Sequence, residues 1–466
     1  MPKQQTNLAT KILSFLNEFP NEFEKTPKNE LFCSICNVIV KHDRRSTITK
    51  HRESYKHSMG MTAVRSKPKQ SFVSTQLENK NEFLSYVARA FLSANIPIYK
   101  ANNPQLKFLF NFLGKPLPSE STLRAHVASI ADIEMLKVRN LITGQMIFIV
   151  IDETDIYGKK YFNTLIGTVS NPDKTYLLDC RVQDGTVNHQ YVVHLVDNLL
   201  RNFQVERHNF CLLLSDAARY MVSAGNVLKE LYPRLLHVTC VSHLFHNCAE
   251  KIRGQYSNVD NLIARVKASI VKNKERKNRF YEIGIPPEPV ITRWTSWLKA
   301  AIYYADNLPE VRNIVNNFNG NGLLVIKAKE ALLDCNLAAN LLSIKRDYEC
   351  VIQLVDRSEK TTYNILSAYQ DLTMINFGVD SCGIKQYLDK RLKNNTDLVT
   401  IATLSRLDIA PTQYHLIQKC QASSASVERS FSMLKKLLAK DRPFNYGNIH
   451  KYFCVYYNSA QEIDNN

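Results

Sequence analysis

The spacing of hydrophobic residues predicts a mixed sheet in the centre of the chain. Residues 145–154 form a continuous apolar and β-branched run, which is typical of a buried strand. Turn residues at 171–173 separate two further strand patterns, and helical spacing follows. The predicted elements are, in order, strands at 145–154, 161–170 and 174–182, a helix at 187–203, a strand at 209–216, a helix at 217–231, and a strand that runs into a helix within 236–245.

This order, β-β-β-α-β-α-β-α, indicates a ribonuclease H-like sheet, with three meandering strands, two crossover strands and helices on both faces. The flanking regions, 80–140 and 256–400, lack strand alternation and are predicted to be helical. Near the end of the chain, one amphipathic helix carries an apolar stripe of Val427, Phe431, Leu434 and Leu438. The predicted fold class is therefore α/β, a mixed sheet interrupted by an all-helical insertion.

Length and charge narrow the class of partner. The 466 residues exceed one compact core and suggest two to four units. Lys and Arg number 60 against 43 Asp and Glu, a formal charge of +17. Such a surplus implies a polyanionic partner, either nucleic acid or an anionic membrane surface. No apolar run approaches the ~20 residues of a spanning helix, so we expect nucleic acid and no membrane.

The cysteines and the first residues indicate the compartment. Residues 1–19 contain only a short apolar stretch and no small-residue cleavage site, so they do not predict a secretory signal. Eleven cysteines, an odd number, are scattered over the chain, which fits reduced thiols in the cytosol or nucleus. We expect this basic chain in the nucleus.

Four residues near the amino terminus have the spacing of zinc ligands. Cys33 and Cys36 are followed by His51 and His57, as Cys-x2-Cys-x14-His-x5-His. Zn²⁺ prefers a tetrahedral set of this kind, with two thiolates from a tight turn and two histidines from one helix. The alternative is that the four residues fall in register by chance. The spacing favours a structural Zn²⁺ site.

The segment 31–57 resembles the BED-type zinc finger and, more closely, the finger of the CGG triplet repeat-binding protein family. That resemblance implies binding to double-stranded DNA. Residues 1–70 contain 13 Lys and Arg against 6 Asp and Glu, a balance that suits phosphate contacts, although a charge run is more often only a solvated face. The candidate DNA-binding residues here are Arg44, Arg45, Lys50 and Arg52.

Acidic residues at strand ends form a second candidate site. Asp152 ends the first predicted strand and Asp216 the fourth, and these strands are expected to be neighbours. Glu428 lies in the first turns of the late helix. Such a carboxylate cluster suits two divalent cations that promote in-line phosphoryl transfer. The alternative for Asp216 is that it only caps the helix at 217–231.

Ordered blocks of the chain resemble the hAT superfamily of DNA transposases. They read FIVIDETDIYGKKYFNTLIGT, LLLSDAARYM, HVTCVSHLFHNCAEKI, TRWTSW and SSASVERSFSMLKKLLAKDRP, and the resemblance covers roughly residues 31–459. It implies metal-dependent DNA cleavage and strand transfer, with the three acidic residues coordinating Mg²⁺ or Mn²⁺. Glu153 and Asp155 are possible substitutes near the first carboxylate, but the family pattern and the strand phase favour Asp152.

The resemblance also assigns residues that would handle DNA. Cys240 and His243 match a Cys-x2-His motif of the family. His246 and Cys248 follow closely, so a second zinc site is an alternative, as are a buried core thiol and a hydrogen-bonded histidine.

A tryptophan motif completes the candidate DNA contacts. Trp294 matches a family tryptophan that could stack on an extruded base, with Arg293 as a phosphate contact. Trp297 is then expected to be a core residue.

One departure from the family pattern concerns assembly. Asp216 and Glu428 are 212 positions apart, a shorter insertion than in many relatives, which puts DNA-end contacts and higher-order assembly there in doubt. The late helix with Phe431, Leu434 and Leu438, together with the aromatic run HKYFCVYY at 450–457, resembles the dimerisation region of the family and implies a homo-oligomer, at least a dimer. The alternative is that these residues pack within the chain, and the two are compatible.

The predicted organisation combines these parts. It comprises a flexible tail (1–30), a BED-like C2H2 zinc finger (31–60), a linker (61–79), a helical region (80–140), the first part of the core (141–255), a helical insertion (256–400), and the rest of the core with the dimerisation region (401–466). Two functions fit: a DNA transposase or a protein derived from one, and a catalytically silent DNA-binding transcriptional regulator. The charge disfavours a third, an interaction protein with no DNA role.

Overall fold

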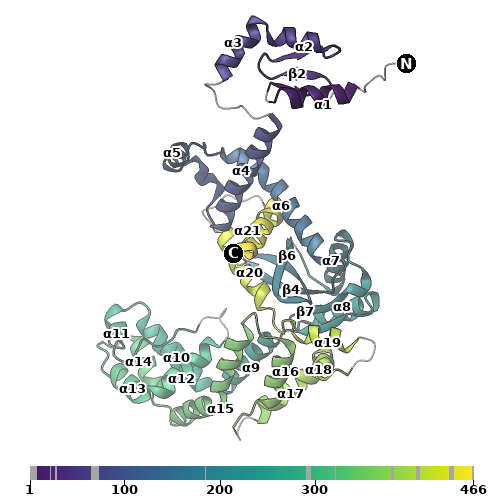
Figure 1. Cartoon of the computed structure of the whole chain (residues 1–466). Helices are drawn as coiled ribbons and strands as arrows, with labels where there is room; N and C mark the ends of the chain where they lie inside the picture. Colours follow the sequence, from purple (N-terminus) through teal and green to yellow (C-terminus); the bar gives the residue numbers. More distant parts are fainter. Residues whose placement is uncertain are drawn as a thin grey trace. The chain divides into compact units, whose positions relative to one another are not determined.

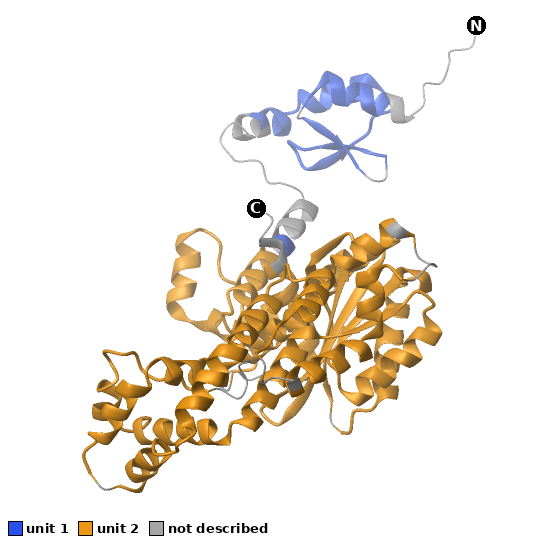
Figure 2. Ribbon diagram, turned by 90° about the horizontal axis from the view of Figure 1, so that it is seen from below, with its two compact units in different colours: residues 1–82 blue, residues 83–466 orange. Residues whose placement is uncertain are grey.

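The chain divides into two compact units, Met1–Glu82 and Phe83–Asn466 (Figure 2). The structure is a computed structural model that describes residues 8–20, 22–26, 29–64, 73–183, 185–289, 295–320, 322–378, 382–405, 410–439 and 446–463. It is a mixed α/β protein with a small amino-terminal sheet, a larger mixed sheet and many helices (Figure 1).

Unit 1 is built on a three-stranded antiparallel sheet of order β1-β2-β3. Its elements are α1 (Leu8–Glu18), β1 (Phe23–Lys25), β2 (Leu31–Cys33), β3 (Val38–Val40), α2 (Arg45–Arg52) and α3 (Tyr55–Val64). Ile12 and Phe15 of α1 are buried in one cluster with Ile48 of α2 and the strand residues. The sequence allowed one short amphipathic helix at Leu8–Phe19 within the predicted tail at 1–30, and the structure has α1 there, which together with β1 completes the core of the finger.

The predicted linker at 61–79 is also shorter than expected. Helix α3 ends at Val64, α4 (Val73–Ser93) begins nine residues later, and residues 65–72 lie outside the described part. The helical spacing of the next region is confirmed by η1 (Ile98–Asn102), α5 (Pro104–Phe112) and α6 (Glu120–Ile142).

The large sheet has the order β6-β5-β4-β7-β8. Its elements are β4 (Ile147–Ile156), β5 (Lys159–Thr168), β6 (Asn171–Gln183), α7 (His189–Asn202), η2 (Arg207–Asn209), β7 (Phe210–Ser215), α8 (Arg219–Leu231), β8 (Leu236–Thr239) and α9 (Val241–Gln255). The predicted order of strands and helices is thus confirmed. β4 pairs with β5 in antiparallel and with β7 in parallel orientation, so the predicted neighbours are adjacent.

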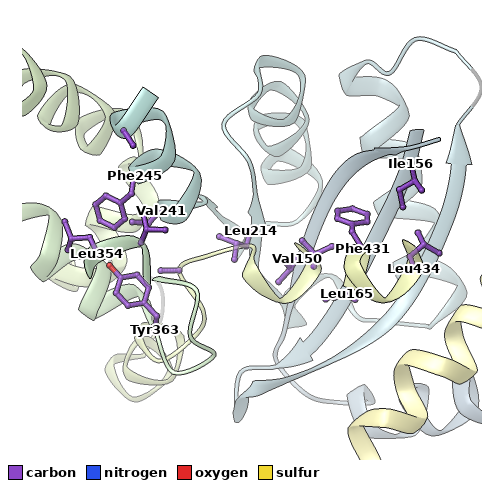
Figure 3. Packing of buried hydrophobic residues seen from close by; sticks show 14 of the residues in the cluster. Val150, Ile156, Leu165, Leu214, Val241, Phe245, Leu354, Tyr363, Phe431 and Leu434 are labelled. Atoms are coloured by element: carbon purple, nitrogen blue, oxygen red, sulfur yellow. The ribbon is translucent and has the colours of Figure 1, made fainter. Parts of the chain in front are cut away.

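The two faces of the sheet are covered by different helices. Ile147 and Ile149 share a cluster with apolar residues of α7 and α8, whereas the alternate residue Val150 belongs to the large core on the other face. Figure 3 shows Phe431 and Leu434 of α20 (Ala425–Leu437) beside Val150. The same core continues past Leu214 to Val241, Phe245, Leu354 and Tyr363, so sheet and insertion share one hydrophobic interior (Figure 3).

The region after α9 is helical in its described part. Its helices are α10 (Ser257–Ile270), α11 (Lys274–Asn278), α12 (Ser296–Asp306), α13 (Leu308–Asn316), α14 (Leu323–Ala331), α15 (Leu337–Ser358), α16 (Ile365–Met374), α17 (Cys382–Asn394) and α18 (Thr396–Thr403). Trp297 is 4% exposed in this core, as expected. Within the described segments, no helix combines the length and the apolarity that crossing a membrane requires.

The chain then returns to the sheet. The closing elements are α19 (Pro411–Gln418), α20, η4 (Tyr446–Asn448) and α21 (Ile449–Ile463). All four residues of the predicted apolar stripe, Val427, Phe431, Leu434 and Leu438, are buried in the large core. The stripe therefore packs within the chain, and this face of α20 is not available for the dimer contact that the resemblance implied.

Candidate functional site

The four predicted zinc ligands meet in unit 1. Cys33 ends β2, Cys36 lies in the turn before β3, His51 is in the last turn of α2 and His57 is in α3. One potential ligand atom of each lies within 4.8 Å of the others. The antiparallel β2–β3 pair therefore supplies the thiols, and two successive helices, rather than the single helix expected, supply the imidazoles.

The spacing of these atoms fits a tetrahedral Zn²⁺ site. His57 Nδ1 lies 3.4 Å from Cys33 Sγ, 3.4 Å from Cys36 Sγ and 3.3 Å from His51 Nε2. Ligand bonds of ~2.0–2.3 Å place tetrahedral ligand atoms about 3.3–3.7 Å apart. Burial, followed by the neighbouring His57, lowers the pKa of His51 and so favours the neutral imidazole that a metal needs.

The carboxylate of Glu22 lies next to one candidate ligand, His57. Glu22 Oε2 lies 3.3 Å from His57 Nε2, an ion-pair contact rather than an aligned hydrogen bond. Arg52 donates to both oxygens of Glu22, from Nε at 2.6 Å and from the terminal nitrogen at 2.9 Å. The hydrogen bond from Arg52 outweighs burial and lowers the pKa of Glu22, which holds it as a carboxylate. The sequence carried no signal for Glu22, because its partners lie 30 and more positions away.

The predicted DNA-binding residues of the finger divide into two pairs. Arg52 is held by Glu22 and lies over the Phe19 ring, 4.0 Å from its centroid, while Arg45 forms an ion pair with Glu18. Arg44 and Lys50 are exposed at the start of α2 and along it. Arg52 therefore supports the ligand cluster, and Arg44 and Lys50 remain the candidates for phosphate contacts.

Replacing Glu22 with glutamine is expected to lower the zinc affinity by about tenfold or more. A carboxylate behind a ligand histidine orients the ring and raises its basicity, and its loss usually lowers the metal affinity by roughly 10- to 100-fold. Competition against a chromogenic chelator measures the effect. Glu18→Gln is the matched control, because it removes the ion pair with Arg45 and no neighbour of the ligands. Equal affinities of the two variants would show that Glu22 only supports the fold.

The predicted carboxylates lie at one end of the large sheet. Asp152 is in β4 just beyond its paired stretch with β7, Asp216 follows the last residue of β7, and Glu428 is in the first turn of α20. Ligand atoms of Asp152, Glu428 and His243 lie within 4.8 Å of one another. Asp216 is outside that group and accepts a hydrogen bond from the Ala218 backbone N–H at 3.1 Å.

The electrostatics of this cluster favour a positive partner. Burial raises the pKa of Asp152 well above its ordinary value, and the charges of Glu428 and Asp216 add to the effect. Burial also raises the pKa values of Asp216 and Glu428. Asp152 is 3% exposed, and its Oδ2 atom has no hydrogen-bond partner among the described residues. A buried carboxylate oxygen of this kind could serve as a ligand for a hard cation.

His243 supplies part of that positive charge. Burial opposes its protonation, but Cys240, Asp152 and Glu428 raise the pKa of His243 to about 10. Its Nε2 lies 3.7 Å from Glu428 Oε1. The resemblance implied that His243 lies near the active centre and handles DNA, and the structure adds its contact with Glu428.

Cys240 holds this histidine in position. Ser424 donates to Cys240 Sγ from its backbone N–H at 3.1 Å and from its hydroxyl at 3.2 Å, and the hydroxyl lies 3.2 Å from His243 Nδ1. Burial acts against the thiolate, yet the charge of His243 and these hydrogen bonds bring the pKa of Cys240 below its ordinary value. The Cys-x2-His motif therefore joins the start of α9 to the start of α20.

Other predicted residues fall elsewhere. Cys248 is fully buried in the large core, and no second four-ligand cluster forms within the described residues, which favours the core interpretation over another zinc site. Arg293 and Trp294 lie outside the described residues. Ten of the cysteines form no disulfide in the described part of the chain, all but Cys382.

Comparison with known proteins adds an independent observation on unit 1. Residues 10–63 match the family described as the CGGBP1 N-terminal domain, a range that includes most of α1, all of β1 and the four candidate ligands. CGG triplet repeat-binding protein 1 of Mus musculus is 29% identical and that of Homo sapiens 30% identical, each over 135 residues. Each match covers 26% of this chain and 80% of the relative. On that identity and coverage, the chain belongs to the CGG triplet repeat-binding protein family.

Proposed function

We propose that this protein binds double-stranded DNA through its amino-terminal zinc-binding domain. The observation that carries the proposal is the tetrahedral set of Cys33, Cys36, His51 and His57 within the stretch that matches the family domain. The relatives are named for binding CGG triplet repeats, so a CGG-repeat duplex is the first probe. Arg44 and Lys50 are the exposed cations that would contact its phosphates. A nuclear location and the net charge of +17 accord with this role.

Fluorescence anisotropy with a labelled CGG-repeat duplex and a scrambled duplex of equal composition tests the proposal. The wild-type chain is expected to prefer the repeat and to lose affinity steeply as salt rises from 50 to 200 mM, roughly the range over which counterion release dominates. Cys36→Ala should remove the preference and leave only weak binding by the basic remainder. Cys335→Ala, at an exposed thiol outside the domain, is the control. A Cys36→Ala protein that still discriminates between the duplexes would rule out the zinc domain as the reader.

A second candidate function is metal-dependent phosphoryl transfer on DNA, as in a hAT transposase with a ribonuclease H-like core. It is favoured by the meeting of Asp152 and Glu428 from elements far apart in the sequence, with Asp216 beside them. Mg²⁺ or Mn²⁺ bound there would activate the attacking oxygen and stabilise the leaving oxygen. The carboxylate oxygens of Asp152 and Glu428, including the unpartnered Asp152 Oδ2, suit such hard cations, and His243 adds an imidazole to the same group.

The residues of the chain would have separate roles in that reaction. Asp152, Glu428 and Asp216 would hold the cations, while His243 lies within reach of a phosphate that approaches Glu428. Cys240 and Ser424 would fix the orientation of His243. If Trp294 and Arg293 contact the DNA end, they would do so from the segment before α12.

A catalytically silent DNA-binding regulator is the alternative, and the family match to unit 1 supports it better than it supports transposition. In that case the carboxylates would serve no reaction, and the large unit would act as a scaffold. A homo-oligomer, at least a dimer, belongs to either proposal, but its interface would lie away from the buried stripe of α20.

A further inference from the structure

A hollow of about 780 Å³ opens beside Asp216 within unit 2. Its walls come from the starts of α8 and α9, the end of β8, and the junction of α17 and α18. It therefore lies beyond the carboxyl ends of parallel strands β7 and β8, where open α/β sheets commonly bind ligands. Asp216, Cys240 and His243 of the candidate site lie on one side of this hollow, whereas Arg219, Asn226, Asn247, Tyr387 and Arg391, which also line it, have no role in the functions proposed so far.

The wall of the hollow that the start of α18 forms is hydrogen-bonded to the sheet. Asn395 accepts from the backbone N–H of Thr239 at 3.2 Å and donates to its carbonyl at 3.0 Å. Asp397 accepts from the backbone N–H of His237 at 2.7 Å and forms an ion pair with Lys229. The start of α18 thus continues the hydrogen bonding of β8, and the hollow is preformed rather than dependent on a ligand.

The lining favours an anion. Arg219 and Arg391 are exposed there, and neither forms an ion pair with any described residue. Lys229 is a further cation of the lining. The acidic residues close to these cations are Asp216, which also lines the hollow, and Asp397, which forms an ion pair with Lys229. α8 and α9 begin at this hollow, and neither has a side-chain cap, so backbone N–H groups and the positive ends of two helices add to the same potential.

Other residues that line the hollow could contact a nucleobase, so the lining suits a nucleotide better than a bare phosphate. Tyr387 presents an aromatic ring with the Arg391 guanidinium 5.3 Å from its centroid. Asn226 and Asn247 place exposed amides on α8 and α9, and amides can donate to and accept from base edges. The volume is in the range of ~300–1,000 Å³ typical of small-ligand sites, which leaves no room for a duplex.

We propose that this hollow binds a short single-stranded stretch of nucleic acid, whose phosphates contact Arg219 and Arg391 and whose base lies against Tyr387. The bound strand would lead to Asp216 and so to the neighbouring carboxylates. The proposal extends the second candidate function above, because it names the form in which DNA reaches the acidic cluster. It concerns binding, and it is tested without any reaction.

The experiment measures anisotropy of a labelled five-thymidine oligonucleotide with the full chain in EDTA. Arg219→Glu and Arg391→Glu are each expected to weaken binding by about tenfold or more, because each reverses a charge-assisted phosphate contact. Arg207→Glu is the matched control, since Arg207 is exposed before the opposite end of β7 and carries the same charge change. Thermal unfolding of all three variants checks that the fold is kept.

Each outcome decides the matter. Loss in the two hollow variants, with the CGG-repeat duplex bound as in the wild type, supports a single-strand site. Equal affinity of the hollow variants and Arg207→Glu overturns it. Equal weakening of single strand and duplex also overturns it, because that pattern shows only long-range charge. If the site binds the strand but the protein does not cleave DNA in Mg²⁺ or Mn²⁺, phosphoryl transfer fails and the site stands.

Discussion

Replacing Cys36 with serine is expected to unfold the amino-terminal domain while the large unit keeps its structure. Among the described residues of unit 1, the hydrophobic core has eight buried members, two of which are the candidate ligands Cys33 and Cys36. So small a core does not offset the entropy of ordering its chain. Structural zinc contributes about 10–16 kcal/mol of apparent binding free energy in finger peptides, and that energy is folding energy.

Limited proteolysis of the full chain measures this effect, with and without a chelator. Cleavage within residues 8–64 should appear in the Cys36→Ser protein and in chelator-treated wild type, and the thiolate bands that Co²⁺ gives in the wild type should be weakened or lost in the Cys36→Ser protein. The control Cys335→Ser changes an exposed thiol in unit 2 and should behave as the wild type. A chelated wild-type protein that resists cleavage there would mean that the domain folds without metal.

If the second candidate function holds, Asp152→Asn is expected to abolish metal-dependent DNA cleavage and, in metal-free protein, to stabilise the fold. Loss of a carboxylate removes a cation ligand and leaves phosphate charge uncompensated, so cleavage of supercoiled plasmid in Mn²⁺ should fall by about a thousandfold. Stability moves in the opposite direction, because asparagine removes a buried charge that lies near two others. Opposite effects on activity and stability are typical of a functional group rather than a structural one.

The pH dependence of the stability follows from the raised pKa of Asp152. Burial raises the pKa of Asp152 above its unfolded value, so the folded state binds more protons than the unfolded state between the two values. Without metal, the free energy of unfolding should therefore fall as the pH rises from about 4 through the raised pKa. Asp152→Asn should flatten that part of the profile, and Mg²⁺ should restore stability to the wild type.

Glu153→Gln is the matched control for this site. Glu153 is the next residue of β4, and its side chain forms an ion pair with Lys160 at 3.2 Å. The Glu153→Gln protein should retain the cleavage activity and show the wild-type dependence of stability on pH. If Glu153→Gln is inactive and Asp152→Asn is active, the first carboxylate has been assigned to the wrong residue. A wild-type protein that cleaves no DNA, with unchanged duplex binding by Asp152→Asn, would favour the silent regulator.

Periodicity predicted the large sheet well, because buried strands are long apolar runs and the intervening helices have clear spacing. The adjacency of β4 and β7 could be predicted from the order of the elements. Asp152 and Asp216 could be identified as candidates because each lies at a strand end. The ligand spacing of Cys33 and Cys36 was equally direct, since both thiols belong to one turn.

Contacts between distant segments were beyond the reach of these patterns. Ile12 and Phe15 have helical spacing, but nothing local shows that α1 packs on the finger rather than standing free. Glu22 is one acidic residue among several, and only the fold places it beside His57. His243 likewise joins the carboxylates because α9 starts where α20 starts, a meeting set by tertiary packing.

The return of α20 to the sheet has a consequence for synthesis. Asn163 in β5 donates to Ser430 at 2.8 Å across 267 positions of sequence, and α20 covers a face of β4 and β5. At about 5–20 residues per second, a ribosome needs roughly 15–50 s to make the intervening chain. Until translation reaches the last helices, the nascent sheet lacks the cover that α20 gives to β4 and β5 in the folded chain, so this part of the core can complete its packing only at the end of synthesis.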